Sequence, residues 1–118
     1  MRFAYSRRTF LIGAFLGTLS QLAFGESRTV ELAIYNGEAS PKGRVLSVSQ
    51  DDEVVVRITS DTPLQIHLHG YDIESDIVPN VVTSLRFTAT ATGRFPIEVH
   101  YEQTGKHRPI AYVEVRPR

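Results

Sequence analysis

Two histidines at alternate positions are the residues of this chain best suited to chemistry. His67 and His69 stand two positions apart in a short run that follows a proline turn. Side chains of an extended strand alternate between its faces, so these two imidazoles point one way and Ile66 and Leu68 the other. Neutral imidazole is a common ligand for copper, zinc and nickel. The spacing predicts two metal ligands on one strand, although a site normally needs three or four. The alternative is that both are solvent-facing strand residues.

Composition excludes several other classes of function. The chain has 118 residues, which indicates one domain, and its 13 basic residues are balanced by 13 acidic ones. It has no basic block of the kind that binds nucleic acid. The absence of cysteine removes disulfides, iron–sulfur clusters, thiolate metal ligands and the blue-copper thiolate. No nucleophile elbow, zinc-protease helix motif or glycine-rich phosphate loop is present, so we expect no enzyme.

The first 25 residues have the pattern of an export signal. They contain no acidic residue, carry the pair Arg7 and Arg8, and continue into the apolar run Leu11–Phe24 and Gly25. The segment around the two arginines resembles a twin-arginine signal. The apolar run is shorter than the roughly 20 residues of a spanning helix, so a cleaved signal is favoured over a membrane anchor. We expect a signal helix in residues 1–25, cleavage after Gly25, a domain in 26–118 without a membrane span, and a periplasmic or otherwise exported protein.

The rest of the chain has the pattern of strands. No segment keeps a helical apolar period, and short runs rich in β-branched and aromatic residues alternate with turn residues. We expect strands over 28–35, 45–48, 53–60, 64–69, 71–78, 81–90, 94–100 and 110–115, with 101–109 as a polar loop. Many short strands at this spacing predict an all-β sandwich or barrel, with two antiparallel sheets enclosing one core.

From Asp51 onward the order of segments resembles the cupredoxin family. The resemblance is to the branch related to cytochrome oxidase subunit II and to the cupredoxin domain of bacterial iron-uptake lipoproteins. It rests on the segments 61–67, 73–80, 82–90, 92–99 and 110–116. It implies an antiparallel Greek-key β-sandwich with a copper site built by its loops.

This chain has residues of the right type at two of the family's copper-ligand positions and lacks them at the others. The resemblance aligns His67 and His107 with the two ligating histidines of the family. The cysteine positions are occupied by Val99 and Gln103, and the methionine position by Ile110. Without sulfur ligands neither a blue-copper centre nor a Cu(I) site is favoured. We therefore expect no blue-copper electron carrier.

Other histidines can replace the missing sulfur. His69 lies two residues beyond His67, and His100 follows the lost cysteine position, so all four histidines can meet at one pole of the sandwich. With Glu102 or Asp72 added, such a set suits Cu(II) or Zn(II). Strand alternation places His100 on the outer face unless the strand bulges. We rank His67 and His107 first as ligands, His69 next and His100 last. Glu98 we expect to form only a solvated pair with His100.

Two functional hypotheses remain open. The first is an exported protein that binds or handles a metal ion, copper first and zinc second, through His67, His69, His107 and His100. The second is a metal-free, degenerate cupredoxin that acts as an interaction module of an envelope metal-transport or respiratory complex. A histidine in a solvated loop or at a strand end fits the second hypothesis as well as the first.

Overall fold

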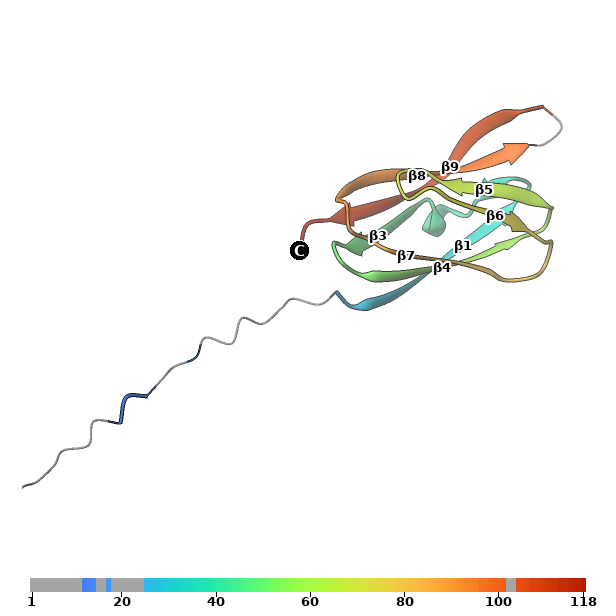
Figure 1. Ribbon diagram of the computed structural model, residues 1–118. Coiled ribbons are helices and arrows are strands. Elements are labelled where there is room, and N and C mark those ends of the chain that lie inside the picture. Colours follow the sequence, from blue (N-terminus) through green and yellow to red (C-terminus); the bar gives the residue numbers. More distant parts are fainter. Residues whose placement is uncertain (1–11, 15–16, 18–24, 102–103) are drawn as a thin grey trace, which may run out of the picture.

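The computed structural model describes residues 12–14, 17, 25–101 and 104–118. The strands between Ser27 and Arg116 form two β-sheets packed face to face (Figure 1). The expected signal helix falls mostly on residues outside these ranges. The strands are β1 (Ser27–Tyr35), β2 (Glu38–Ala39), β3 (Val45–Ser49), β4 (Glu53–Ser60), β5 (Leu64–Leu68), β6 (Ile73–Ile77), β7 (Thr83–Thr88), β8 (Gly93–Tyr101) and β9 (Lys106–Arg116), with a 3₁₀ turn, η1 (Pro41–Gly43). The expected all-β sandwich is confirmed. None of the described residues belongs to a helix long and apolar enough to cross a membrane.

Both sheets are mixed rather than wholly antiparallel. One has the strand order β2-β1-β4-β7 and the other β3-β9-β8-β5-β6. β1 runs parallel to β4, and β3 runs parallel to β9, while the other neighbours are antiparallel. The parallel pairs arise because the chain crosses from β1 to β3 in the second sheet before it returns with β4 to the first.

The core lies between the sheets and follows strand alternation. In β4, for example, Val54, Val56 and Ile58 are at most 1% exposed, whereas Arg57 between them faces solvent. Ile66 and Leu68 of β5 and Ile97 and Val99 of β8 close the core from the other sheet; the rest of it comes from Leu32, Ile34, Ala39, Leu46, Val48, Ile77, Leu85, Phe87, Ala89, Ala111, Val113 and Val115. The inward positions predicted by alternation are therefore confirmed, and the polar side chains of β5 and β8 face outward.

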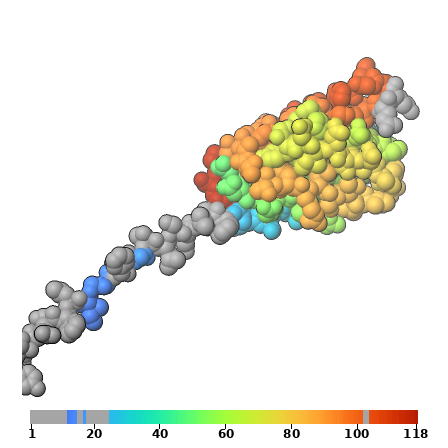
Figure 2. Space-filling model, in the orientation of Figure 1, coloured from blue at the N-terminus to red at the C-terminus, as the bar shows by residue number. Residues whose placement is uncertain are grey.

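The segment expected to be a loop over 101–109 is largely strand. β8 continues to Tyr101 and β9 begins at Lys106, so the two form a long hairpin that projects beyond the rest of its sheet (Figures 1 and 2). Its polar sequence does not prevent strand formation, because the projecting part need not bury either face. Arg108 fixes the base of the hairpin by donating to the carbonyl oxygen of Gly37 at 2.9 Å and to Glu38 at 3.2 Å.

Candidate metal site

The outer face of the five-stranded sheet collects the histidines of β5 and β8. In the antiparallel pairing of these strands His67 lies opposite Glu98, and Gln65 lies opposite His100. Paired residues share a face, and Ile66 and Val99 on the other face are buried in the core. His67, Glu98 and His100 therefore point away from the core, on the same side of the sheet.

A β-bulge brings His107 onto this face. In the pairing of β8 with β9, Ile97 is opposite Ala111 but Glu98 is opposite Pro109, so Ile110 is the extra residue. His107 is four residues from the buried Ala111, and regular alternation would turn it toward the core. The extra residue resets the alternation, so that His107 lies directly opposite His100.

The four imidazoles form one row that runs from the turn after β5 across β5, β8 and β9. The ring centroids of His69 and His67 are 4.1 Å apart, those of His67 and His100 5.7 Å, and those of His100 and His107 4.0 Å. The structure thus brings together all four histidines predicted from the sequence, although they come from three strands and the turn after β5, at positions up to 40 residues apart in the chain (His67 and His107).

Glu98 lies beside this row and is its central carboxylate. Its Oε2 accepts a hydrogen bond from Nε2 of His69 at 2.7 Å and lies 4.0 Å from Nδ1 of His107. Only 20% of its side chain is exposed, compared with 55% for His107. His67 is engaged elsewhere, since its Nε2 donates to Asp72 at 3.3 Å.

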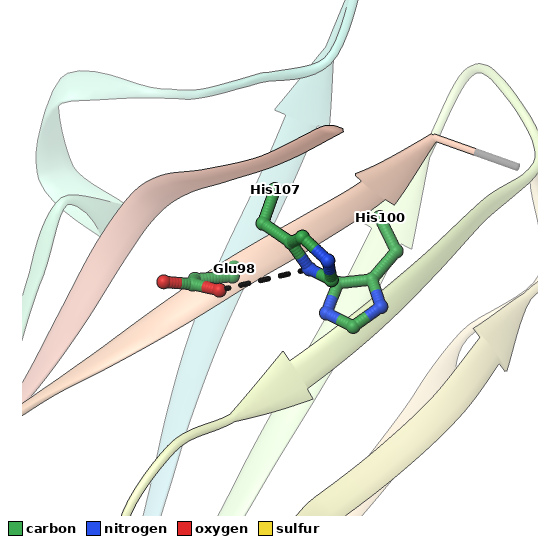
Figure 3. A group of neighbouring side chains, drawn as sticks. All are labelled: Glu98, His100 and His107. Atoms are coloured by element: carbon green, nitrogen blue, oxygen red, sulfur yellow. Dashed lines mark ion pairs between the residues drawn. The ribbon is translucent and has the colours of Figure 1, made fainter. Parts of the chain in front are cut away.

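Within the described part of the chain, one group of side chains has the geometry to hold a metal ion: Glu98, His100 and His107 (Figure 3). Each offers one ligand atom, and the three atoms lie within 4.8 Å of one another. Figure 3 shows the carboxylate and the two rings converging on one side of the β8–β9 hairpin. His67 and His69 flank this group.

His100 has an unsatisfied ring nitrogen. Its Nε2 is buried and has no hydrogen-bond partner among the described residues. Burying an imidazole nitrogen without a partner costs free energy, and a metal ion would supply the missing interaction. Ligand atoms around a tetrahedral ion with bonds of ~2 Å lie about 3.3 Å apart. The ligand atoms of Glu98, His100 and His107 would therefore have to move by roughly 1 Å to bind one ion together. The donor set of two nitrogens and one oxygen therefore fits an ion such as Cu(II) or Zn(II).

The structure does not place the histidines as the family resemblance implies. They gather on the outer face of a sheet, not at a loop pole of the sandwich. Val99, at the lost cysteine position, is 0% exposed and faces the core, on the opposite side of the sheet from His67. Ile110, at the lost methionine position, is the extra residue of the bulge. A blue-copper centre does not fit these positions.

The sequence ranking also differs from the geometry. His100, ranked last, belongs to the convergent group, whereas His67, ranked first, lies next to it. Glu98 was taken for a solvated partner and is instead central. Its signal was available in the sequence, because Glu98 and His100 have the same i, i+2 spacing as His67 and His69. Of the two carboxylates considered, Asp72 contacts His67, and Glu102 lies outside the described residues.

Comparison with known proteins shows the fold. No protein-family model and no curated protein matches this chain. Among solved structures, a chain of a heme-copper terminal oxidase dimer has a TM-score of 0.60 and 15% identity over 80% of this chain and 73% of its own length. The multicopper oxidase mgLAC has a TM-score of 0.54 and 18% identity, over 80% of this chain and 40% of its own. The chain thus has the cupredoxin-like fold that the sequence resemblance implies.

Proposed function

We propose that this is an exported protein that binds a divalent metal ion on the outer face of its five-stranded sheet. Glu98, His100 and His107 are the ligands in this proposal, and copper is the first candidate, followed by zinc. His69 orients Glu98 through its hydrogen bond, and His67 is the nearest further imidazole. The role is binding or handling of the ion, not catalysis.

The observation that carries this proposal is that His100, whose Nε2 is buried and unpartnered among the described residues, belongs to the convergent group with Glu98 and His107. Outward-facing polar residues of a sheet normally satisfy their hydrogen bonds with water or with each other. Here three bonding groups converge while one nitrogen stays without a partner among the described residues. A bound cation satisfies all three at once.

Copper is preferred on chemical grounds. Cu(II) binds a given set of nitrogen and oxygen ligands more tightly than the other first-row divalent ions. Two of the similar solved structures are oxidases with copper in their names, which supports the same choice. The absence of cysteine disfavours Cu(I), so we propose a site that holds the oxidised ion and is not a fast electron carrier.

Export is the second part of the proposal. It is supported by the sequence of the first 25 residues, with paired arginines, an apolar run and small residues before Glu26. An exported chain without cysteine that exposes an imidazole-rich surface is suited to take up and release ions outside the cytoplasm. His107, with 55% of its side chain exposed, leaves the site open to exchange.

Titration with Cu(II) and Zn(II) tests the metal site. We expect one equivalent to bind to the native protein, and Glu98→Gln to weaken binding by more than the 10–100-fold typical of groups that only orient a ligand. Glu31→Gln is the matched control, because it removes the same charge from an exposed strand of the other sheet. Equal affinity in the two variants would exclude Glu98 as a ligand.

A metal-free interaction module is the competing function. The pairs His69–Glu98 and His67–Asp72 are already hydrogen-bonded without an ion, which favours a site that needs none. The likeness to a chain of a terminal oxidase is consistent with an accessory of an envelope respiratory or metal-transport complex. Binding of neither ion above background in the titration would select this alternative.

A further inference from the structure

A buried carboxylate joins the start of β1 to the turn before β4. Asp52 is 0% exposed, and its Oδ2 accepts the backbone N–H of Ser49 at 2.9 Å. Its Oδ1 accepts the backbone N–H of Glu26 at 3.1 Å and also the guanidinium of Arg118. The Ser49 amide in the first place, with the Glu26 amide and Arg118, lowers the pKa of Asp52. A buried charge of this kind is stable only while its partners remain in place.

The chain reaches this carboxylate at a position that admits only glycine. A Cβ atom at Gly25 would lie 1.7 Å from the carbonyl oxygen of Asp51, so the backbone there is in direct contact with the β3–β4 turn. One residue later the carbonyl oxygen of Glu26 accepts the N–H of Glu53 at 2.9 Å, which begins the ladder between β1 and β4. Gly25 and Glu26 therefore join the start of β1 to the β3–β4 turn, with the nitrogen of Glu26 on Asp52.

We propose that cleavage of the Gly25–Glu26 bond converts the Glu26 nitrogen into an α-ammonium that forms a partly buried ion pair with the buried carboxylate of Asp52. Water adds across the bond, Gly25 leaves with the new carboxylate, and the Glu26 nitrogen becomes the protonated amine. The hydrogen bond to Asp52 changes from neutral donor to cationic donor with no movement of the backbone. Maturation thus strengthens the contact that closes this end of the sandwich.

The charge balance around Asp52 supports this pairing. Arg118 contacts the carboxylate, and Arg28 acts on it at longer range. Asp51 and Glu53 flank Asp52 in the chain. Their negative charges offset the positive charge that a second cation would add beside Asp52. A charge-assisted hydrogen bond is roughly twice as strong as a neutral one, and burial preserves the difference. The inference rests on the export part of the proposed function and is independent of the metal site.

The first experiment identifies the end of the mature protein. The full chain is expressed in a host with twin-arginine export, and the intact mass of the exported form is measured. We expect the mass of a chain that begins at Glu26. A different first residue in the exported protein would overturn the inference, whereas a chain that is not exported at all would contradict the export part of the proposed function instead.

The second experiment measures the effect on stability. The exported form is compared with the unprocessed chain, retained in the cytoplasm by Arg7→Lys and Arg8→Lys. We expect the exported form to melt about 4–8 °C higher at pH 7, the shift that a contact of this kind gives a domain of this size. Asp52→Asn in both forms should remove the difference. Equal melting temperatures of the two native forms would overturn the inference.

A pH series supplies the same information if Asp52→Asn fails to fold. Pairing with Asp52 raises the pKa of the α-ammonium above its usual value of about 8, so its contribution is full below about pH 8 and is lost as the pH rises further. The other charged groups around this carboxylate are Arg118 and Arg28. The advantage of the exported form should therefore disappear in alkali, and an advantage that persists there would assign it to another cause.

Discussion

His67 and Val99 lie on opposite faces of the same sheet. Ile66 pairs with Val99 between β5 and β8, and both are fully buried, while the neighbouring His67 faces outward toward Glu98. The position that carries the copper-binding cysteine in the resembling family is thus separated from the histidines by the backbone of the sheet. The same fold is therefore compatible with a metal site in a different place.

Restoring the cysteine should not restore a blue-copper centre. We expect Val99→Cys to fold, at a cost below about 1.5 kcal/mol for a swap of similar volume, and to add a thiol inside the core. With Cu(II) its visible spectrum should lack the intense thiolate-to-copper charge-transfer band, because the ligands lie on the other face. A strong band that is lost in the double variant with His67→Ala would contradict this arrangement.

The four histidines should contribute unequally to metal binding. We expect His100→Ala and His107→Ala to lower the affinity for Cu(II) by more than 100-fold, because each removes one of the proposed ligands. His69→Ala should cost about 10–100-fold, since it removes the group that orients Glu98. His67→Ala should cost least, and isothermal titration of the four variants measures the order. If His67→Ala were the most harmful, the ion would be centred on β5.

Arg118 should protect the protein against acid. The backbone N–H of Ser49 is the main cause that holds the pKa of the Asp52 carboxyl below the usual 3.8, and the charge of Arg118 in contact with Asp52 adds to it. A lowered pKa contributes stability that is complete above about pH 4 and is lost as the pH falls through the folded-state value. We expect Arg118→Gln to lower the free energy of unfolding by about 1–3 kcal/mol at pH 7 and to move acid unfolding to higher pH.

Arg116→Gln is the control for that variant. Arg116 also bonds a carboxylate, that of Glu114, but the pair lies on the surface, with 67% and 31% of the side chains exposed. Exposed pairs contribute between about 0 and 1 kcal/mol. Unfolding in denaturant at pH 7 and at pH 3 compares the two, and similar behaviour of both variants would show that the burial of Asp52 is unimportant.

The glycine after the histidine strand should tolerate no side chain. Gly70 has a φ of +86°, and a Cβ atom there would lie 2.3 Å from Cδ1 of Phe95. We expect Gly70→Ala to cost more than the roughly 1–3 kcal/mol of backbone strain alone, because Phe95 must also move. Gly105→Ala is the control, since φ there is +64° and a Cβ would meet nothing within 4 Å. Thermal unfolding should show the larger loss for Gly70→Ala.

The sequence was sufficient to predict the sandwich and to predict which neighbouring side chains of the candidate site share a strand face. Alternation in β4, β5 and β8 identified the buried faces, because strand side chains have a fixed period of two and apolar residues must be covered. The same period placed His67 with His69 on one face. Applied to Glu98 and His100, it also predicts a shared outer face, but the sequence analysis interpreted this pair as solvated and not as part of the candidate site.

Only the tertiary structure decided that these pairs meet His107. Nothing in the local pattern shows that β5 lies beside β8, and counting back from Ala111 would have turned His107 inward. The extra residue Ile110 turns His107 to the outer face instead. The position of this bulge depends on how β9 pairs with β8 and not on the local sequence of β9. The sequence thus determines which types of ligand are available. Their convergence depends on strand pairing and register, which are properties of the folded sheet.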